Sequence, residues 1–294
     1  MRLGTGAFSG AAGDPPALRL RGASVKRYGD VAAMKLPGGA LLAVACDSLG
    51  AIGPKPQDRV PAPAYVVGRF TCRVPLMELV ALGAEPFLVV CALCVEPEPT
   101  GGGIMAGVRD EVAQAGLDPG AALLGSTEKN VPTSQTGLGV FALGTLARPR
   151  WGRGRPGDLV CAVGLPRVGA GVALEDPAIA DIPTLRLALA CPGVGDAVPV
   201  GSRGIAAEAE GLAHRSGCGF APGAAGALDL CASAGPATCF LVTAAPAALS
   251  LLQRALAPWG RPVTPVGLLV EALGRGGPGP KGRSQAGVEG GGGR

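Results

Sequence analysis

Histidine, aromatic residues and charged residues are scarce in this 294-residue sequence, and each shortage excludes a class of function. The single histidine, His214, cannot build a multi-histidine metal site, and a Ser/His/Asp or Cys/His arrangement would have to use that one ring. Aromatic residues make up 3% of the chain, and no basic run has stacking residues between its charges. We therefore expect no nucleic-acid partner, although the net charge is +4.

A long hydrophobic run is also missing. The longest covers residues 86–95, well short of the ~20 residues of a membrane-spanning helix, and residues 1–13 lack the pattern of a signal peptide. The nine cysteines are an odd number scattered through apolar segments, which favours free thiols over a disulfide framework. These features indicate a cytoplasmic protein with no membrane partner.

Glycine and proline, by contrast, are abundant, at 50 and 28 residues. Such a level often accompanies disorder, but here 48% of the residues are hydrophobic and only 16% are charged, which is typical of a folded chain. The length suits two domains. We expect a flexible arm over residues 1–23, an N-terminal domain over 24–150, a C-terminal domain over 151–273 and a disordered Gly-rich tail over 274–294.

Apolar periodicity predicts strands and helices in both domains. In the N-terminal domain we expect strands over 41–46, 87–95, 121–124 and 137–146, a helix through Val67 and Met77 that ends at Gly83, and a helix from Thr100 to Gly116. In the C-terminal domain we expect strands over 159–163, 197–200, 237–244 and 263–273, and helices over 183–190, 204–215 and around Leu252. Asp181 or a neighbour is expected to cap the 183–190 helix.

Acidic residues at strand ends are the main chemical candidates. Asp47 and Glu128 each follow a predicted strand, Asp30 precedes the first hairpin, and Asp58 closes the loop after Asp47. Mg²⁺ commonly takes one or two carboxylates together with phosphate oxygens, so strand-end acids suit it. The neighbouring cations, which could balance phosphate charge, are Lys55, Arg59 and Lys129. On periodicity alone, surface acids at turns are almost as good an interpretation.

Other phosphate-binding and metal motifs are weak or absent. No lysine follows a glycine, which excludes the Walker loop. The glycines of residues 4–10 follow no strand, and those of residues 163–171 fit an ordinary loop as well as a ligand site. Cys91 and Cys94 lie in a predicted strand, where residues three apart point to opposite faces, so core cysteines are favoured.

Four segments resemble those of a known group of proteins. Tyr28-Gly-Asp-Val-Ala-Ala33, followed by Ala45-Cys-Asp47-Ser, resembles the AIR synthase-related superfamily of ATP-binding proteins, which includes thiamine-monophosphate kinases and a hydrogenase maturation factor. Met77-Glu-Leu-Val-Ala-Leu-Gly-Ala-Glu-Pro86 is similar to a helix of those kinases, and Gly125-Ser-Thr-Glu128 stands where they carry Gly-Gly-Asp-Thr. The similarity extends over about residues 25–273.

One branch of the superfamily is matched more closely. Five segments look like the α-ribazole kinases, and they cover residues 46–58, 125–130, 179–185, 199–205 and 233–239. That resemblance implies ATP-dependent phosphorylation of the 5′-hydroxyl of α-ribazole, the α-nucleoside of 5,6-dimethylbenzimidazole, in cobalamin lower-ligand salvage.

The resemblance also implies a fold, a dimer and a set of site residues. It implies an α+β fold of two domains with AIR synthase-like architecture, namely an N-terminal mixed-sheet domain that binds ATP and Mg²⁺ and a C-terminal α/β domain that binds the acceptor. It implies a homodimer formed through N-terminal strands, with ATP near the interface. The implied metal ligands are Asp30, Asp47 and Glu128. The implied nucleotide-binding residues are Asp30, Asp47, Ser48, Gly125, Ser126, Thr127, Glu128, Lys129 and Asn130.

Catalytic and acceptor-binding roles follow from the same resemblance. Lys55 would offset phosphate charge, and Asp58 or a metal-site acid such as Asp47 would accept the hydroxyl proton. The implied acceptor residues are Gly201, Ser202, Arg203, Gly204, Ser233, Gly235 and Thr238.

The sequence also departs from the thiamine-monophosphate kinases. Val31 replaces the second acid of their Gly-Asp-Asp-Ala-Ala motif, Arg203 stands where they have an aspartate, and Gly235-Pro-Ala-Thr238 replaces Gly-Glu-Asp-Tyr. These changes argue against thiamine monophosphate as the acceptor. The alternatives are another kinase or ligase of the superfamily acting on a thiamine or purine precursor, a nucleotide-binding protein without catalysis, and a structural α/β domain.

Overall fold

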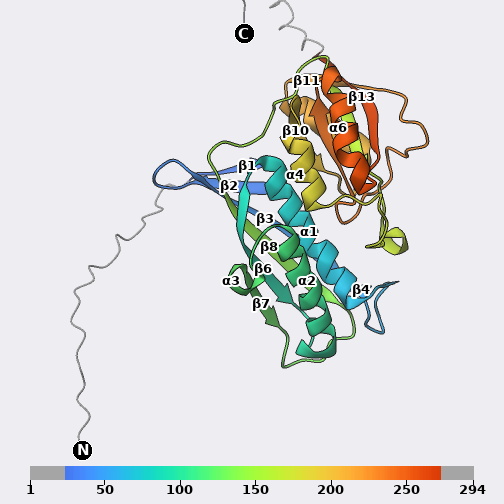
Figure 1. Cartoon of the computed structure of the whole chain (residues 1–294). Coiled ribbons are helices and arrows are strands. Elements are labelled where there is room, and N and C mark those ends of the chain that lie inside the picture. The colour runs from blue at the N-terminus through green and yellow to red at the C-terminus, as the bar shows by residue number, and fades with distance from the viewer. Residues whose placement is uncertain (1–23, 273–294) are drawn as a thin grey trace, which may run out of the picture.

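The computed structural model describes residues 24–272, so the predicted arm over 1–23 and the predicted tail over 274–294 lie outside the described residues. The described chain forms two α+β halves, each built on one sheet, and the long helix α1 (Ala64–Leu82) lies where the halves meet (Figure 1). Within residues 24–272, no helix combines the length and the apolarity needed to cross a bilayer.

The first half is a mixed six-stranded sheet with the order β1-β2-β3-β8-β6-β7. Neighbouring strands are antiparallel except for the β6–β7 pair, which is parallel. Its strands are β1 (Val25–Tyr28), β2 (Val31–Lys35), β3 (Leu41–Gly50), β6 (Glu85–Leu93), β7 (Leu123–Thr127) and β8 (Gly137–Leu146). The remaining elements are β4 (Ile52–Gly53), β5 (Val60–Pro61), the short π-helix η1 (Pro97–Gly101), α2 (Gly102–Gln114) and α3 (Pro119–Ala122).

The second half is an antiparallel five-stranded sheet with the order β10-β12-β9-β13-β11. Its strands are β9 (Leu159–Gly164), β10 (Val194–Pro199), β11 (Cys218–Pro222), β12 (Cys239–Ala244) and β13 (Val263–Glu271). Its α-helices are α4 (Ile182–Ala190), α5 (Gly204–Arg215) and α6 (Leu249–Leu256), and its short 3₁₀ helices are η2 (Gly169–Gly171), η3 (Pro246–Ala248) and η4 (Ala257–Trp259). The mixed α+β class is therefore confirmed.

Local sequence signals placed several elements well. Strand β8 and helix α5 have the predicted bounds. Asp181 caps α4 in a capping box with Thr184, and Gly83 ends α1 in a left-handed conformation with φ of 84°. Thr100, however, does not cap α2, because its hydroxyl donates to Glu96 instead.

The end of strand β3 differs from the prediction. We expected the strand to stop before Asp47, but it continues to Gly50, because the ladder with β8 pairs Asp47 with Val140 and Gly50 with Gly137. Asp47 therefore lies inside a strand and not in a loop. Strand β11, which pairs with β13, was not predicted.

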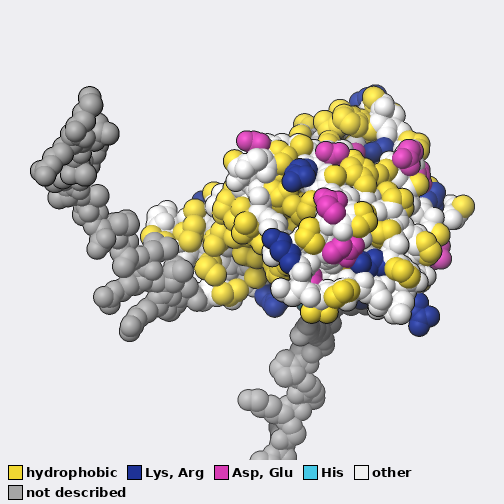
Figure 2. Space-filling view, turned by 90° about the horizontal axis from the view of Figure 1, so that it is seen from below, with side chains coloured by type: hydrophobic (Ala, Val, Ile, Leu, Met, Phe, Trp, Pro, Cys, Tyr) yellow, Lys and Arg dark blue, Asp and Glu magenta, His cyan; other side chains and the backbone are white. Residues whose placement is uncertain are grey.

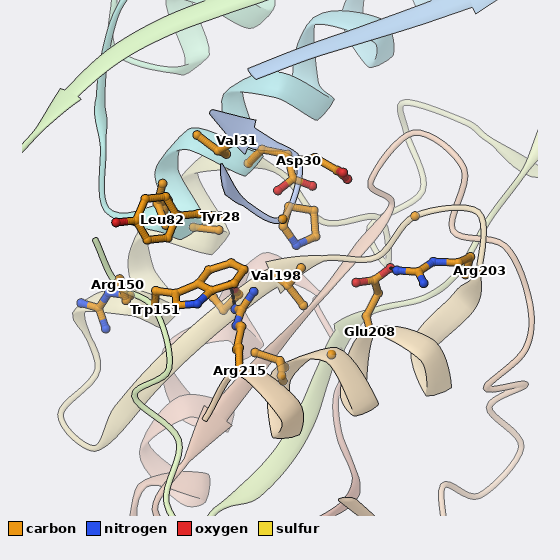
Figure 3. Close-up of a pocket in the computed structure, with 18 residues that line it drawn as sticks. Tyr28, Asp30, Val31, Leu82, Arg150, Trp151, Val198, Arg203, Glu208 and Arg215 are labelled. Atoms are coloured by element: carbon orange, nitrogen blue, oxygen red, sulfur yellow. Dashed lines mark hydrogen bonds and ion pairs between the residues drawn. The ribbon is translucent and has the colours of Figure 1, made fainter. Parts of the chain in front are cut away.

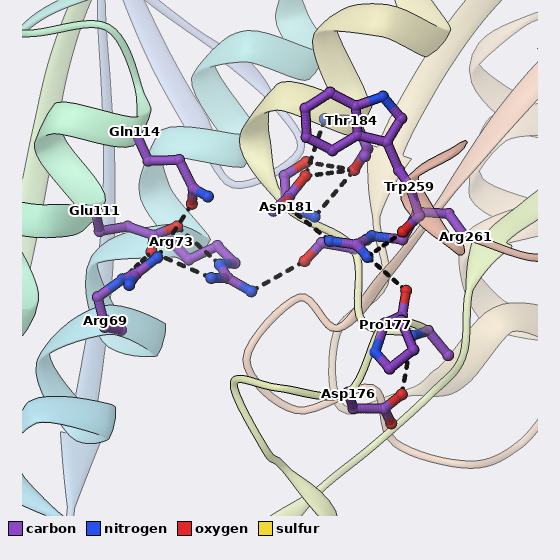
Figure 4. A network of polar contacts seen from close by, with 12 residues as sticks. Arg69, Arg73, Glu111, Gln114, Asp176, Pro177, Asp181, Thr184, Trp259 and Arg261 are labelled. Atoms are coloured by element: carbon purple, nitrogen blue, oxygen red, sulfur yellow. Dashed lines mark hydrogen bonds and ion pairs between the residues drawn. The ribbon is translucent and has the colours of Figure 1, made fainter. Parts of the chain in front are cut away.

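A buried ionic network joins the two halves (Figure 4). The guanidinium of Arg73 on α1 contacts the carboxylate of Glu111 on α2 at 2.8 Å, and Arg69 contacts the other carboxylate oxygen at 2.7 Å. Arg73 also donates at 3.0 Å to the backbone carbonyl of Ala180 in the second half. The next residue, Asp181, pairs with Arg261 at 2.8 Å. The buried charges are thus matched, and the match fixes how α1 sits against the second half.

Helices α1 and α2 pack so closely that glycine is required at their contact. A Cβ atom added at Gly68 would collide with the backbone carbonyl of Ile104, and one added at Gly107 would collide with that of Tyr65.

The surface of the molecule carries few charged side chains. Figure 2 shows one face, seen from below, with hydrophobic side chains spread widely and charged side chains scattered between them.

The Gly68 contact gives a test of the helix packing. We expect Gly68→Ala to lower the free energy of unfolding by about 1–3 kcal/mol, because the added methyl group forces α1 and α2 apart. The matched control is Gly211→Ala on α5, where no atom lies within 4 Å of the added Cβ. There alanine should stabilise slightly, since it is the better helix former. Denaturant unfolding measures both, and equal effects would contradict the close contact.

Candidate functional site

A small pocket lies between the β1–β2 turn, the C-terminal part of α1 and one face of α5 (Figure 3). It has a volume of about 180 Å³ and gathers charges of both signs. We call it the hairpin pocket; its charged lining residues are Asp30, Glu78, Arg150, Arg203, Glu208 and Arg215. Asp30 comes from the hairpin, while Glu208 and Arg203 approach from the second half and are paired at 3.4 Å.

Two aromatic side chains in contact, Tyr28 and Trp151, form part of the lining of the hairpin pocket. The Tyr28 ring meets Trp151 edge-on, with centroids 5.5 Å apart. Arg215 lies over Trp151 at 4.2 Å and donates to the buried carboxylate of Asp196 at 2.8 and 2.9 Å. The turn between β1 and β2 uses Gly29 at φ of 60°, a conformation that favours glycine, and so presents Asp30 to the pocket.

A second cavity, of about 370 Å³, lies where β3 and α1 face the loops of the second half. Asp47 and Ser48 line it from β3, Phe70 and Thr71 line it from α1, and residues 168–172 and 235–236 close it from the second half. We call it the junction cavity. Its position beside Asp47 makes it a candidate acceptor site.

The acids of the two sites act on one another electrostatically. Burial raises the pKa of Asp47, and the nearby charge of Asp30 raises it further, against a lowering hydrogen bond from the Ser48 backbone. Burial also raises the pKa of Glu78 to about 8, with additional repulsion from Asp30, Glu208 and Asp47 and an opposing attraction from Arg215. Glu208 behaves in the same way, since burial raises its pKa and Asp30 adds to the shift, while Arg203 lowers it. These four carboxylates form one acidic cluster between the halves.

A third pocket collects the predicted nucleotide-binding residues of the segment 125–129 except Glu128. Gly125, Ser126, Thr127 and Lys129 line a space of about 520 Å³ at the edge strand β7, together with Arg109 of α2. None of the lining residues that the structure describes there is acidic. The pocket suits an anion, but it lies at the far edge of the sheet from Asp47.

Within one folded chain, Glu128 does not lie close to Asp30 and Asp47. Its carboxylate accepts hydrogen bonds from the backbone of Asn130 and Val131, and it follows β7, which is three strand positions from β3. At the usual strand spacing that is about 14 Å. Across residues 24–272, no three Asp, Glu, His or Cys side chains are grouped so that they alone could hold a metal ion. The three-ligand set of Asp30, Asp47 and Glu128 is thus not assembled.

Lys55 and Asp58 are both engaged within the protein. The Lys55 ammonium pairs with Glu96 and donates to the carbonyl of Thr133. Both carboxylate oxygens of Asp58 accept hydrogen bonds from Thr136, and one also accepts from the Lys55 backbone. These bonds hold the loop after β3 against the loop before β8. The catalytic roles predicted for Lys55 and Asp58 stay predictions.

The predicted acceptor residues are divided between the two sites. Gly201 and Arg203 line the hairpin pocket, and Gly235 lines the junction cavity. Thr238 is fully buried behind the cavity wall, where its hydroxyl accepts from the Arg167 backbone at 2.8 Å. Ser202 is exposed in the turn before α5, Gly204 begins that helix at φ of 81°, and the Ser233 hydroxyl accepts from the Gly235 backbone.

Sequence reasoning missed Glu78 and Glu208. Glu78 lies in α1 between the buried residues Met77 and Leu79, and an acid in such an apolar stretch was the one available signal. Glu208 gave no signal, because its importance depends on α5 packing beside the β1–β2 hairpin.

Comparison with known proteins supports the fold. Neither a protein-family model nor a curated protein sequence matches this chain. Among solved structures, thiamine-monophosphate kinase from Stenotrophomonas maltophilia K279a is 19% identical over 84% of this chain and 89% of its own, with a TM-score of 0.57. The hydrogenase maturation protein HypE of E. coli is 17% identical over 79% and 80%, with a TM-score of 0.57. AaThiL complexed with AMPPCP and TMP is 16% identical over 83% and 85%, with a TM-score of 0.53.

These likenesses confirm the AIR synthase-like fold that the sequence motifs predicted. Thiamine-monophosphate kinase and the hydrogenase maturation factor are members of the superfamily that the motifs resemble. The α-ribazole kinase branch stays a prediction.

The pKa of Glu78 gives a test of the acidic cluster. Between pH 4.5 and about 8 the folded protein keeps a proton on Glu78 that the unfolded chain releases, so this contribution to stability is lost as the pH rises through that range. We expect Glu78→Gln to unfold at a higher temperature than the wild type at pH 8, both without metal, and the difference should shrink toward pH 4.5.

The control for this test is Glu210→Gln, which changes an exposed glutamate on the same helix as Glu208. It should leave the wild-type pH dependence unchanged. Parallel melting-temperature curves for Glu78→Gln and the wild type would contradict the raised pKa.

Proposed function

We propose that this chain is an ATP- and Mg²⁺-dependent small-molecule kinase whose acceptor is a nucleoside hydroxyl, with the 5′-hydroxyl of α-ribazole as the first candidate. The fold is shared with thiamine-monophosphate kinase and with a structure that holds the ATP analogue AMPPCP. The α-ribazole acceptor rests on the resemblance of five sequence segments to the α-ribazole kinases.

The observation that carries the proposal is the acidic cluster beside the junction cavity. The charge of Asp30 raises the cost of ionising Asp47, and Asp30 and Asp47 both raise the cost of ionising Glu78, a cost that a bound cation removes. Mg²⁺ needs only one or two protein carboxylates when phosphate oxygens complete its ligands, so the donor set fits this metal without a closed three-residue site.

In the proposed mechanism the chain acts mainly by positioning. Mg²⁺ on the nucleotide would neutralise the phosphate charge. Asp30 and Asp47 would hold the metal, with Glu78 adjacent, while Arg203 offers a cation from the second half. A bond forms between the hydroxyl oxygen and the γ-phosphorus as the bond to the bridging oxygen breaks and ADP leaves. Asp58 or a metal-site acid such as Asp47 would accept the hydroxyl proton.

Asp47→Asn tests the proposed function. We expect the wild type to release ADP with α-ribazole in the presence of Mg²⁺, and Asp47→Asn to reduce the rate by about 100-fold or more, because it removes one of the carboxylates that would hold the metal on the phosphates. Asp110→Asn is the matched control: this exposed aspartate on α2 bonds to the Tyr65 hydroxyl, away from both sites. It should keep full activity.

The same assay separates the alternatives. ADP release with thiamine monophosphate or a purine precursor, and none with α-ribazole, would replace the acceptor but keep the kinase. ATP binding by calorimetry without turnover on any acceptor would favour a non-catalytic nucleotide-binding protein. Full activity of a folded Asp47→Asn would refute the role given to the cluster.

We propose further that the active form is a homodimer joined through the open face of the first sheet. Helices α1 and α2 cover one face, where Ala45, Val140 and Val89 are buried. On the other face, one row across the ladder consists of Cys46, Phe141, Val90 and Leu124. Phe141 is 42% exposed and Leu124 is 62% exposed. A second copy that covers this row would remove the apolar patch from water.

Sedimentation of the wild type and of Phe141→Asp tests the dimer. We expect the wild type to sediment at twice the chain mass of 28.9 kDa, and Phe141→Asp to sediment as a monomer, because the charge would be buried unpaired at the interface. Leu251→Asp, on the surface of α6, is the control and should remain dimeric. A monomeric wild type, or a dimeric Phe141→Asp, would contradict this interface.

A further inference from the structure

A further pocket lies against the segment that joins the two halves of the chain. One wall is formed by residues 152–158 of that segment, and the opposite wall by residues 193–195 and Ala245 of the second half. We call it the linker pocket; its volume is about 510 Å³. It lies where β9 begins and β12 ends, whereas the loops of the junction cavity lie at the other ends of these two strands, about 17 Å away. The linker pocket is therefore a separate site.

Two arginine side chains without a partner lie on the first wall. Arg153 and Arg155 are exposed while Gly154 between them is buried, so the two side chains project from the same side of the segment. Among residues 24–272, neither guanidinium lies within ion-pair distance of a carboxylate. The acid that lines the pocket, Asp158, accepts the backbone N–H of Arg155 at 2.8 Å. The lining thus carries a surplus of positive charge.

The backbone between these arginines is fixed in place. The N–H of Gly152 donates to the fully buried carboxylate of Asp196 at 2.8 Å, and the N–H of Gly154 donates to the Ser216 hydroxyl at 3.2 Å. These bonds anchor the segment to the second half and leave the arginine side chains outside. A ligand that binds them would therefore not have to order the backbone, which lowers the entropic cost of binding.

A third arginine, Arg150, is bonded to the opposite wall. Its guanidinium donates to the carbonyls of Val194 and Gly195 at 3.2 and 2.8 Å. Burial lowers the pKa of Arg150, and the nearby charge of Arg153 lowers it further, against a smaller opposing effect of Asp196. The positive charges around the pocket thus repel one another, and a bound anion would reduce that repulsion.

We propose that the linker pocket binds a small anion with two phosphate groups, of the pyrophosphate class, through Arg153 and Arg155. The proposal concerns a second ligand site, outside the hairpin pocket and the junction cavity. It does not depend on the proposed kinase function.

The lining selects this class of anion. A guanidinium can form two parallel hydrogen bonds to one phosphate group, so two arginines suit two such groups. The opposite wall carries no side chain larger than valine, and Gly193 and Gly195 let a ligand approach the backbone closely. None of the described lining residues is aromatic, so a nucleobase would find no stacking partner there.

Calorimetric titration of the full chain with inorganic pyrophosphate tests the proposal. A chelator keeps divalent metal out, so that phosphate groups cannot bind the acidic cluster through a cation. We expect pyrophosphate to bind at least about tenfold more tightly than inorganic phosphate, because the second phosphate group adds hydrogen bonds to a charged partner. Equal affinities, or no binding of pyrophosphate, would overturn the proposal.

Variants of the two arginines place the binding in this pocket. Arg153→Gln and Arg155→Gln should each weaken pyrophosphate binding about tenfold or more, because each removes a charged donor pair. Arg153→Lys keeps the charge but loses the planar fork, so its affinity should lie between those of the wild type and Arg153→Gln. Melting temperatures verify that the variants are folded.

Two matched controls change exposed arginines elsewhere. Arg254→Gln lies on α6 and outside the linker pocket, and Arg109→Gln removes the arginine of the pocket at β7, which also suits an anion. Neither should weaken pyrophosphate binding. Wild-type affinity in a folded double variant of Arg153→Gln and Arg155→Gln, or a loss of binding in Arg109→Gln, would overturn the proposal.

Discussion

The arrangement of the two halves depends on the buried guanidinium of Arg73. It is matched by the Glu111 carboxylate within the first half and by the Ala180 carbonyl in the second. Breaking a buried ion pair from one side costs about 3–5 kcal/mol, so α1 is strongly held against the segment that leads into α4. Helix α1 in turn presents Phe70 to the junction cavity and Glu78 to the hairpin pocket, about 12 Å apart along its axis. One buried charge thereby sets the relative position of both sites.

The elements that sequence reasoning placed well carry their signals locally. Helix α4 has its own capping box at Asp181, and α1 has its own glycine stop at Gly83. The predicted strand over 41–46 is shorter than β3 because Asp47 and Ser48 are residue types common in loops. Pairing with the partner strand β8 is what makes that segment extended. Strand β11 contains glycine and proline, which are uncommon in strands, and it pairs with β13. No local sequence pattern predicts that pairing.

The candidate site was predictable in part for the same reason. Asp30 and Asp47 stood in recognisable motifs, and the structure couples their charges. Glu128 also stood in a motif, but the strand order β3-β8-β6-β7, which the sequence does not state, separates it from Asp47. Glu78 gains its significance only when the hairpin and α5 close over α1. Site residues that belong to a local sequence motif can thus be predicted from the sequence. Site residues that depend on packing between distant segments cannot.

The hydroxyl of Thr238 has a consequence for how such a protein could evolve. It accepts from the Arg167 backbone and donates to the Ala234 carbonyl, so it ties the two loops that form the outer wall of the junction cavity to each other. The inner wall and Asp47 belong to the other half of the chain. The outer wall is therefore separable from the rest of the cavity: both loops can diverge together and reshape the cavity, while Asp47 and the walls from the first half stay as they are.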